Sequence, residues 1–208
     1  MEGLWPGYYF AYGSNLSTAQ MRYRCPRAKP IALAHLNGPW TFQINERGFA
    51  NIHSPPTPPA EDIAAVRERR AQPYINAHPT PGVYGMLYRT TLADERSLDY
   101  HEGVPFAYQR KLMPVTVIYA PSNEGPGVGV TVEALVYVDH RTNPGVPGSD
   151  YIERMNRGIA QAENWCLPEW YVEHVLRRFI PENMADEWEQ DPEDEDGRGW
   201  AIICRQWL

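Results

Sequence analysis

Apolar and polar residues alternate along several stretches of the chain, and this two-residue period is typical of β-strands buried on one face. Six stretches are expected to form strands: residues 8–12, 40–45, 48–53, 82–89, 108–119 and 129–138. The last two are long and flank a turn at 124–127, so they predict a β-hairpin. Residues 31–34 form a further short apolar run.

Four helices are expected, and the second of them places an acidic residue at an unfavourable position. The first begins with the spacing of a capping box at 17–20 and ends before Pro26. The second runs from Thr91 to Gly103, a residue type that commonly ends helices. Glu102 therefore lies in its last turn, where the negative end of the helix dipole disfavours a carboxylate. Helix stability alone does not explain a glutamate there.

Two more helices follow the long hairpin. One is expected to be capped by Ser149 or Asp150 and to end at Asn164. The other ends at Pro181. Strands that meander along the chain with helices between them favour an α+β fold with a small mixed or closed sheet. We expect a single domain over residues 1–181.

Two segments depart from this pattern. Residues 55–81 contain seven prolines and are interpreted as a long surface insertion, either a passive excursion or a lid near a site. Residues 182–208 begin with an acidic linker, because nine acids and no Lys or Arg fall between 182 and 196. The end, 200–208, is too apolar for a free tail and is expected to pack as a strand or against a partner chain, and the second arrangement would be compatible with a homodimer.

The uneven charge narrows the range of partners. The net charge of −7 comes from residues 182–208, since residues 1–181 carry 17 acidic and 17 basic side chains. A neutral body gives no reason to expect nucleic acid or an anionic membrane as partner. The sequence has neither an apolar run near the roughly 18 residues of a membrane span nor the start of a signal peptide. Three cysteines without metal-like spacing favour a cytoplasmic protein with reduced thiols and no metal site.

The strongest candidate for a binding element is the turn after the first strand. Gly13, Ser14 and Asn15 are expected to form a tight turn, because Gly and Asn tolerate unusual backbone angles. A strand that turns directly into a helix leaves backbone N–H groups unpaired, and such groups bind carboxylates and other oxyanions. We expect this turn to hold the anionic end of a small-molecule substrate, with Glu102 across from it.

Two sequence motifs, one around the glycine turn and one around Glu102, together support this interpretation. Residues 9–16 read Tyr-Phe-Ala-Tyr-Gly-Ser-Asn-Leu, and residues 98–104 read Leu-Asp-Tyr-His-Glu-Gly-Val. In this order the pair resembles the γ-glutamyl cyclotransferase family with its AIG2-like members, and residues 82–88 and 150–171 resemble further parts of it. The resemblance implies a small mixed β-barrel with flanking helices, and it implies that Glu102 is the catalytic acid/base.

The resemblance also implies an intramolecular reaction of the lyase or acyltransferase class, with no cofactor. The α-amine of a γ-glutamyl group attacks its own γ-carbonyl, which releases an amine or amino acid and leaves 5-oxoproline. Glu102 would carry the proton if burial raises its pKa. Its sequence neighbours are expected to provide an apolar setting: Tyr100, Val104, Phe106 and Tyr108. The implied substrate-binding residues are Tyr12, Gly13, Ser14, Asn15, Leu16, Tyr108, Tyr137 and Tyr151.

Three functions are compatible with these residues. The first is a cyclotransferase acting on γ-glutamyl peptides or glutathione-derived conjugates, in glutathione or secondary metabolism. The second uses the same pocket and Glu102 for another proton transfer, of isomerase or lyase type, on a small secondary metabolite. The third is a binding protein without catalysis, although the presence of Glu102 and the intact turn weigh against it.

Overall fold

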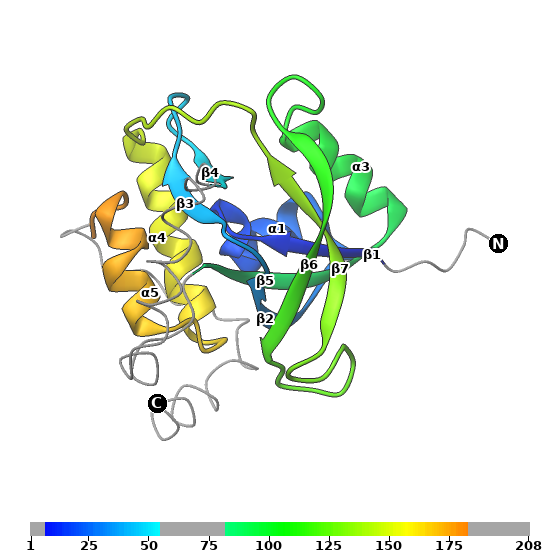
Figure 1. The fold of residues 1–208 in the computed structure, drawn as a ribbon. Coiled ribbons are helices and arrows are strands. Elements are labelled where there is room, and N and C mark those ends of the chain that lie inside the picture. The colour runs from blue at the N-terminus through cyan, green and yellow to red at the C-terminus, as the bar shows by residue number, and fades with distance from the viewer. Residues whose placement is uncertain (1–6, 55–81, 183–208) are drawn as a thin grey trace, which may run out of the picture.

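The computed structural model of the chain describes residues 7–54 and 82–182. The predictions for the insertion at 55–81 and for residues 183–208 lie outside the described residues. Within them, five strands close into a barrel, a two-stranded hairpin lies beside it, and four α-helices flank it (Figure 1). This arrangement confirms the expected α+β fold with a small mixed barrel.

The barrel is mixed because one of its five strand pairs is parallel. Around the ring the strands are β1 (Gly7–Ala11), β5 (Val83–Thr90), β2 (Lys29–Leu36), β6 (Gln109–Tyr119) and β7 (Thr131–Val138). β7 closes the ring against β1 in parallel, where Tyr9 pairs with Leu135, and the other four pairs are antiparallel. β6 and β7 form the long hairpin that the alternating pattern predicts.

β2 is the strand that the alternating pattern does not reveal. It lies between β5 and β6 in the ring, and residues 31–34 are all buried. Both faces of this part of the strand are therefore covered, so the sequence shows a continuous apolar run instead of alternation.

The second hairpin is formed by β3 (Thr41–Ile44) and β4 (Ala50–His53), as expected, and it lies outside the barrel. Buried hydrogen bonds tie it to the end of β7. Asp139 N–H donates to Asn51 Oδ1 at 3.0 Å, and Asn51 Nδ2 donates to the Asp139 carbonyl oxygen at 3.0 Å.

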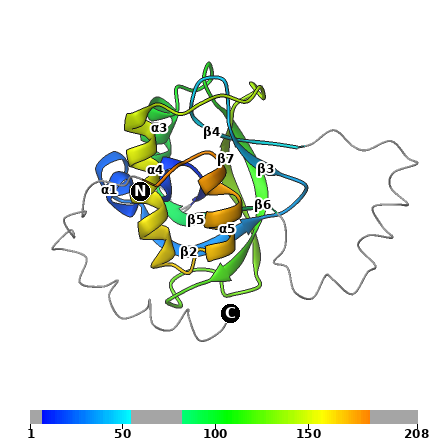
Figure 2. The same cartoon turned by 90° about the vertical axis from the view of Figure 1, so that its left-hand side faces the viewer.

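The helices lie on different sides of the barrel. They are α1 (Thr18–Arg24), α3 (Leu92–His101), α4 (Ser149–Glu163) and α5 (Glu169–His174), with short 3₁₀ turns η1 (Ser14–Leu16) and η3 (Leu176–Arg178). Figure 2 shows α4 and α5 beside each other over the barrel. The expected buried stripe of α4 includes Met155 and Ile159, which have no exposed surface.

Two helix boundaries differ from expectation. Gly148 is the N-cap of α4 and makes no side-chain capping bond, so neither Ser149 nor Asp150 serves as the cap. The last helix stops at His174, and η3 follows after Val175, whose φ is −117°. Leu176, the first residue of η3, has no exposed surface.

The cysteines differ from one another. Cys25 is a buried free thiol, whereas Cys166 is disulfide-bonded, so the expectation of reduced thiols does not hold at Cys166. Over residues 7–54 and 82–182, no helix combines the length and apolar character that crossing a membrane requires.

Candidate active site

The loop after β1 makes one 3₁₀ turn that uses only some of its backbone N–H groups. Leu16 N–H donates to the Gly13 carbonyl oxygen at 2.8 Å, and Ser17 N–H donates to that of Ser14 at 3.2 Å. The N–H groups of Gly13, Ser14 and Asn15 take part in no backbone turn bond within the described residues. The Ser14 N–H faces the Tyr151 hydroxyl as a donor, so the amides of Gly13 and Asn15 are the ones in this loop that remain for other partners.

α1 and α4 hold this loop in place. Ser17 caps α1 as expected, since its hydroxyl oxygen accepts a hydrogen bond from Gln20 N–H at 3.1 Å. The Gln20 side chain does not complete a capping box and instead donates to Ser14 Oγ at 3.0 Å and Asn15 Oδ1 at 2.8 Å. From α4, Gln161 Oε1 accepts the Ser17 hydroxyl at 2.8 Å.

A side chain at position 13 would be crowded by its neighbours. A Cβ at position 13 would lie 3.1 Å from the Ala50 Cβ and 3.2 Å from the Tyr151 hydroxyl. Neither Gly13 nor Asn15 has a positive φ. The predicted turn is present, and Gly13 has φ −104° and ψ −146°, outside the helical and extended regions.

Glu102 follows α3 directly, and the helix end fixes its position. Its N–H donates to the Leu98 carbonyl oxygen at 2.8 Å, and Gly103 adopts φ +63°, where glycine is favoured. At the other end of α3, Thr91 and Asp94 form a reciprocal capping box. The Glu102 side chain is only 16% exposed.

Asn15 links the loop to Glu102. Its amide nitrogen donates to Glu102 Oε1 at 3.1 Å and to the Tyr9 hydroxyl at 2.9 Å. Its amide oxygen accepts hydrogen bonds from Gln20 at 2.8 Å and from Arg24 at 3.1 Å, and Arg24 Nη1 lies 3.8 Å from Glu102 Oε1. The amide has two donor hydrogens and two acceptor lone pairs, and all four are occupied. Its side chain therefore orients Glu102 and has no hydrogen bond left for a substrate.

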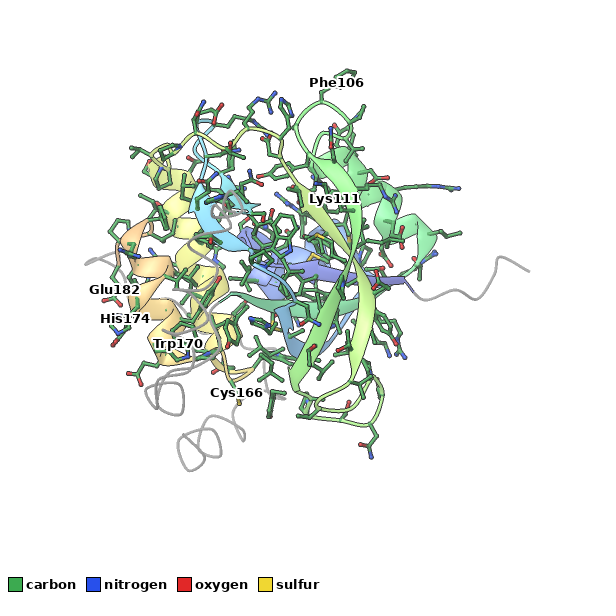
Figure 3. All side chains as sticks on the ribbon, in the orientation of Figure 1. Phe106, Lys111, Cys166, Trp170, His174 and Glu182 are labelled. Atoms are coloured by element: carbon green, nitrogen blue, oxygen red, sulfur yellow. The ribbon has the colours of Figure 1, made fainter. Side chains whose placement is uncertain are left out.

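Burial raises the pKa of Glu102 above its ordinary value, against the opposing effects of the Arg24 charge and the Asn15 hydrogen bond. Of the apolar neighbours predicted for it, Tyr108 is buried at the cavity, whereas two others are exposed. Tyr100 and Phe106 are 83% and 84% exposed, and Phe106 points away from the molecule (Figure 3). The buried rings that line the cavity with Glu102 come mostly from distant parts of the chain: Tyr9, Tyr12, Tyr108, Tyr137 and Tyr151.

The tyrosine hydroxyls of the cavity are not equivalent. Three of them donate to protein acceptors: Tyr12 to the Tyr137 carbonyl oxygen at 2.5 Å, Tyr108 to the Ala50 carbonyl oxygen at 2.7 Å, and Tyr137 to Asp99 Oδ1 at 2.7 Å. These three hydroxyls therefore have no hydrogen left to donate to a substrate.

Tyr9 and Tyr151 instead act as acceptors. Tyr151 OH accepts from Ala50 N–H at 3.0 Å, and Tyr9 OH accepts from Asn15 at 2.9 Å. Each keeps its own hydrogen as a donor. Burial raises the pKa of Tyr151 to about 12 and that of Tyr9 well above its ordinary value, so both remain protonated at neutral pH.

These groups surround a cavity of about 270 Å³, a size suited to a small metabolite. Its lining residues are Tyr9, Tyr12, Gly13, Ser14, Asn15, Arg24, Arg47, Phe49, Ala50, Tyr100, His101, Glu102, Gly103, Ala107, Tyr108, Tyr137, Tyr151 and Arg154. Every predicted site residue is among them except Leu16. Leu16 is fully buried, and its N–H is bonded to Gly13, so its position does not support contact with a substrate.

Sequence reasoning missed Tyr9 and three arginines. Tyr9 has a sequence signal, because it stands beside the glycine turn in the aromatic strand. Arg24 closes α1, Arg47 lies in the turn between β3 and β4, and Arg154 lies in α4. The arginines have no such signal, because the three elements that carry them meet only in the folded chain.

The chain thus folds as a mixed barrel in which a strand-to-helix loop and a buried glutamate line one small cavity. The sequence comparison then identifies its relatives. The family model described as "Gamma-glutamyl cyclotransferase, AIG2-like" matches residues 9–156, so the chain belongs to this family.

Solved structures share the fold. A protein titled "Gamma-glutamyl cyclotransferase" is 20% identical, with a TM-score of 0.58 over 97% of this chain and 99% of its own. An uncharacterized protein from Homo sapiens is 22% identical, with a TM-score of 0.59 over 90% and 96%. YkqA from Bacillus subtilis is 20% identical, with a TM-score of 0.57 over 86% of this chain and 56% of its own. A search of curated proteins finds no match.

Proposed function

We propose that this protein is a γ-glutamylcyclotransferase that converts a γ-glutamyl peptide or glutathione-derived conjugate into 5-oxoproline and a free amine. One observation carries the proposal. Glu102, whose pKa is raised by burial, lines a small cavity and is hydrogen-bonded to Asn15 of the loop that has unused backbone amides. A carboxyl group with a raised pKa can accept and return a proton near neutral pH.

The loop is proposed to hold the α-carboxylate of the γ-glutamyl group. The N–H groups of Gly13 and Asn15 are not used in the turn bonds, and Arg24 adds a positive charge beside them. Backbone amides of this kind bind carboxylates. Holding the α-carboxylate places the α-amine near its own γ-carbonyl, and this positioning is the main requirement of an intramolecular attack.

Glu102 is proposed to move one proton in two steps. Both of its contacts use Oε1, which leaves Oε2 to take a proton from the α-ammonium group. The freed amine forms a bond to the γ-carbonyl carbon. The bond from that carbon to the leaving nitrogen then breaks as Glu102 returns the proton to this nitrogen. The ring nitrogen, which became positively charged on attack, releases its extra proton to solvent, and the free amine takes up a proton to become an ammonium group. The products are 5-oxoproline and this ammonium, and no water is consumed.

The hydroxyls of Tyr9 and Tyr151 are proposed to donate to the carbonyl oxygen as negative charge develops on it. They support this role because each keeps a hydrogen, whereas the hydroxyls of Tyr12, Tyr108 and Tyr137 donate to the fold. Donors that are already oriented stabilise such a charge more than water does.

The test is release of 5-oxoproline from γ-glutamylalanine, glutathione and an S-alkylated glutathione. Wild type is expected to release it from at least one compound, and Glu102→Gln is expected to lower kcat by about 10²- to 10⁴-fold. Glu153→Gln, on α4 and outside the cavity, is the matched control and is expected to keep its activity. Full activity of folded Glu102→Gln would exclude the proposed role. No release from any compound by wild type would favour another proton transfer or a binding function.

A further inference from the structure

A second group of positive charge lies on the aromatic wall of the cavity. The guanidinium carbon of Arg47 lies 5.4 Å from the centre of the Phe49 ring, and that of Arg154 lies 5.2 Å from the centre of the Tyr151 ring. These two rings contact each other edge to face, with centres 5.1 Å apart. One aromatic pair therefore carries a cation on each of its members, and all four residues line the cavity.

This pair of arginines is separate from Arg24. Arg24 contacts Asn15 at 3.1 Å and lies 3.8 Å from Glu102, beside the loop. Among the cations, Arg24 has the largest lowering effect on the pKa of Glu102, followed by Arg47 and Arg154. The order agrees with Arg47 and Arg154 lying farther from the carboxyl group.

The protein neutralises the positive charge of this wall only in part. Arg47 contacts the buried carboxylate of Asp139 at 2.8 Å, but Asp139 also binds Arg141 at 3.0 Å, so one negative charge serves two guanidinium groups. Arg154 lies 3.6 Å from Asp150, whose side chain is 85% exposed. Solvent screens such a pair, which leaves most of the charge of Arg154 available.

We propose that Arg47 and Arg154 form a subsite for the carboxylate of the leaving group. The preferred substrates would then be γ-glutamyl amino acids or peptides, and γ-glutamyl amines without a carboxylate would react poorly. This inference rests on the proposed function. The lining contains three arginines and a single acid, Glu102, so the cavity favours a substrate with net negative charge. Guanidinium groups bind carboxylates through two parallel hydrogen bonds, which also fixes their orientation.

The chemistry of the leaving group matches this arrangement. A γ-glutamyl amine has one carboxylate and one ammonium group and is neutral overall. A γ-glutamyl amino acid has a second carboxylate, separated by one carbon from the nitrogen that Glu102 would protonate. If the loop amides bind the α-carboxylate of the γ-glutamyl group, the carboxylate of the leaving amino acid needs other cations. Arg47 and Arg154 are proposed to be these cations.

The experiment compares an acid with its own carboxamide. We would measure kcat/KM for 5-oxoproline release from γ-glutamylalanine and γ-glutamylalaninamide. Wild type is expected to prefer the acid by about 10- to 100-fold, the range of a hydrogen bond to a charged group. In Arg47→Gln and in Arg154→Gln this ratio is expected to fall toward one.

Matched variants separate the subsite from general effects. Arg157→Gln removes a charge one turn from Arg154 on α4 but outside the cavity, and it is expected to keep the wild-type ratio. Arg47→Lys retains the charge if Arg47→Gln fails to fold after losing its contact with Asp139. Equal rates for acid and amide in wild type would overturn the proposal. A proportional loss with both substrates in the arginine variants would also overturn it, because the arginines would then bind the γ-glutamyl carboxylate itself.

Binding to Glu102→Gln separates this proposal from the proposed function. Calorimetric titration with γ-glutamylalanine and with γ-glutamylalaninamide needs no turnover. Glu102→Gln is expected to bind the acid more tightly than the amide, and the double variant with Arg154→Gln is expected to lose this preference. That result would support the subsite even if wild type released no 5-oxoproline. In that case only the proposed function would be rejected. Equal affinity for acid and amide would reject the subsite, even if the enzyme cyclises both compounds.

Discussion

Arg24 and Asn15 act on the same oxygen of Glu102, and they determine how readily this residue ionises. Asn15 donates to Oε1 at 3.1 Å, and Arg24 Nη1 lies 3.8 Å from the same atom. Both favour the carboxylate and oppose the effect of burial, which raises the pKa of Glu102 and remains the larger effect. The pKa of Glu102 is therefore set by the balance between burial, which favours the protonated acid, and these two contacts, which favour the carboxylate.

Replacing Arg24 by Gln is expected to shift the acidic limb of the profile of kcat/KM against pH to higher pH. Removal of the positive charge raises the pKa of Glu102 further, so the carboxylate that accepts the substrate proton forms only at higher pH. The profile of kcat/KM against pH measures this shift. Arg24→Lys should restore a limb close to that of wild type, and Arg22→Gln, in α1 but outside the cavity, should not move it. An unchanged limb in Arg24→Gln would show that Glu102 does not set it.

Tyr108 and Tyr151 bind opposite sides of one residue, which allows a matched comparison. Tyr108 donates to the Ala50 carbonyl oxygen, and Tyr151 accepts from the Ala50 N–H. Phenylalanine at either position leaves one buried group of Ala50 unpaired and is expected to cost about 1–3 kcal/mol of stability. Tyr151→Phe also removes a free donor, so kcat should fall by about 10²-fold, and Tyr108→Phe should lower kcat much less. Thermal unfolding and kcat measure the two effects, and equal kcat values would contradict the donor role of Tyr151.

At the scale of elements, α4 is pressed against the loop that shapes the site. A Cβ at Gly158 would lie 3.0 Å from the Leu16 Cβ and 3.2 Å from the Ser17 nitrogen. Leu16 has no exposed surface, and Ser17 caps α1, so neither neighbour can move freely. The helix can therefore approach the loop this closely only with glycine at that position.

Gly158→Ala is expected to destabilise the protein and to displace the loop. Alanine would normally stabilise a helix interior by about 1 kcal/mol relative to glycine, but the contacts at 3.0 and 3.2 Å introduce overpacking that costs about 1–3 kcal/mol. We expect a lower Tm together with a lower kcat/KM for 5-oxoproline release. A rise in Tm would show that α4 can shift away from the loop without strain.

The elements also show which local signals were reliable. The alternating pattern located β6 and β7, and the capping residues located the ends of α3, because both signals depend on neighbours along the chain. β2 was read only as an apolar run, and the last helix was predicted to be continuous although it breaks at Val175. In both cases burial among other elements overrode the local pattern, and a sequence does not show that burial.

At the scale of the whole molecule, Asp139 joins the hairpin outside the barrel to the end of β7. It is 1% exposed and accepts hydrogen bonds from Asn45 at 3.0 Å and from Arg47 at 2.8 Å. Burial by itself would raise the pKa of this carboxyl group, but the Arg141 N–H and the two guanidinium groups hold it below its ordinary value. The carboxylate is therefore the form that the folded chain stabilises.

Asp139→Asn is expected to lower the free energy of unfolding by about 2–3 kcal/mol at pH 7, since hydrogen bonds to the charged group are lost. The folded-state pKa lies below the ordinary value of 3.8, so this contribution is complete above that pH and is lost as the pH falls through the folded-state pKa. Urea unfolding of both proteins at pH 7 and pH 3 measures the difference. Asp150→Asn, at an exposed site, should change stability little. A difference that is the same at both pH values would contradict the ionic role of Asp139.

The sequence by itself determined the local features of this protein. The two family motifs, the glycine turn, and the unfavourable place of Glu102 at the end of a helix are all visible in consecutive residues. Tertiary structure decided the burial of Glu102, which tyrosine hydroxyls remain free, and where the three arginines meet. Asn15 and Glu102 are 87 positions apart, and Tyr12 and Tyr137 are 125 apart. Periodicity and capping act over one or two turns of chain, whereas pKa values and hydrogen-bond partners depend on groups that only folding brings together.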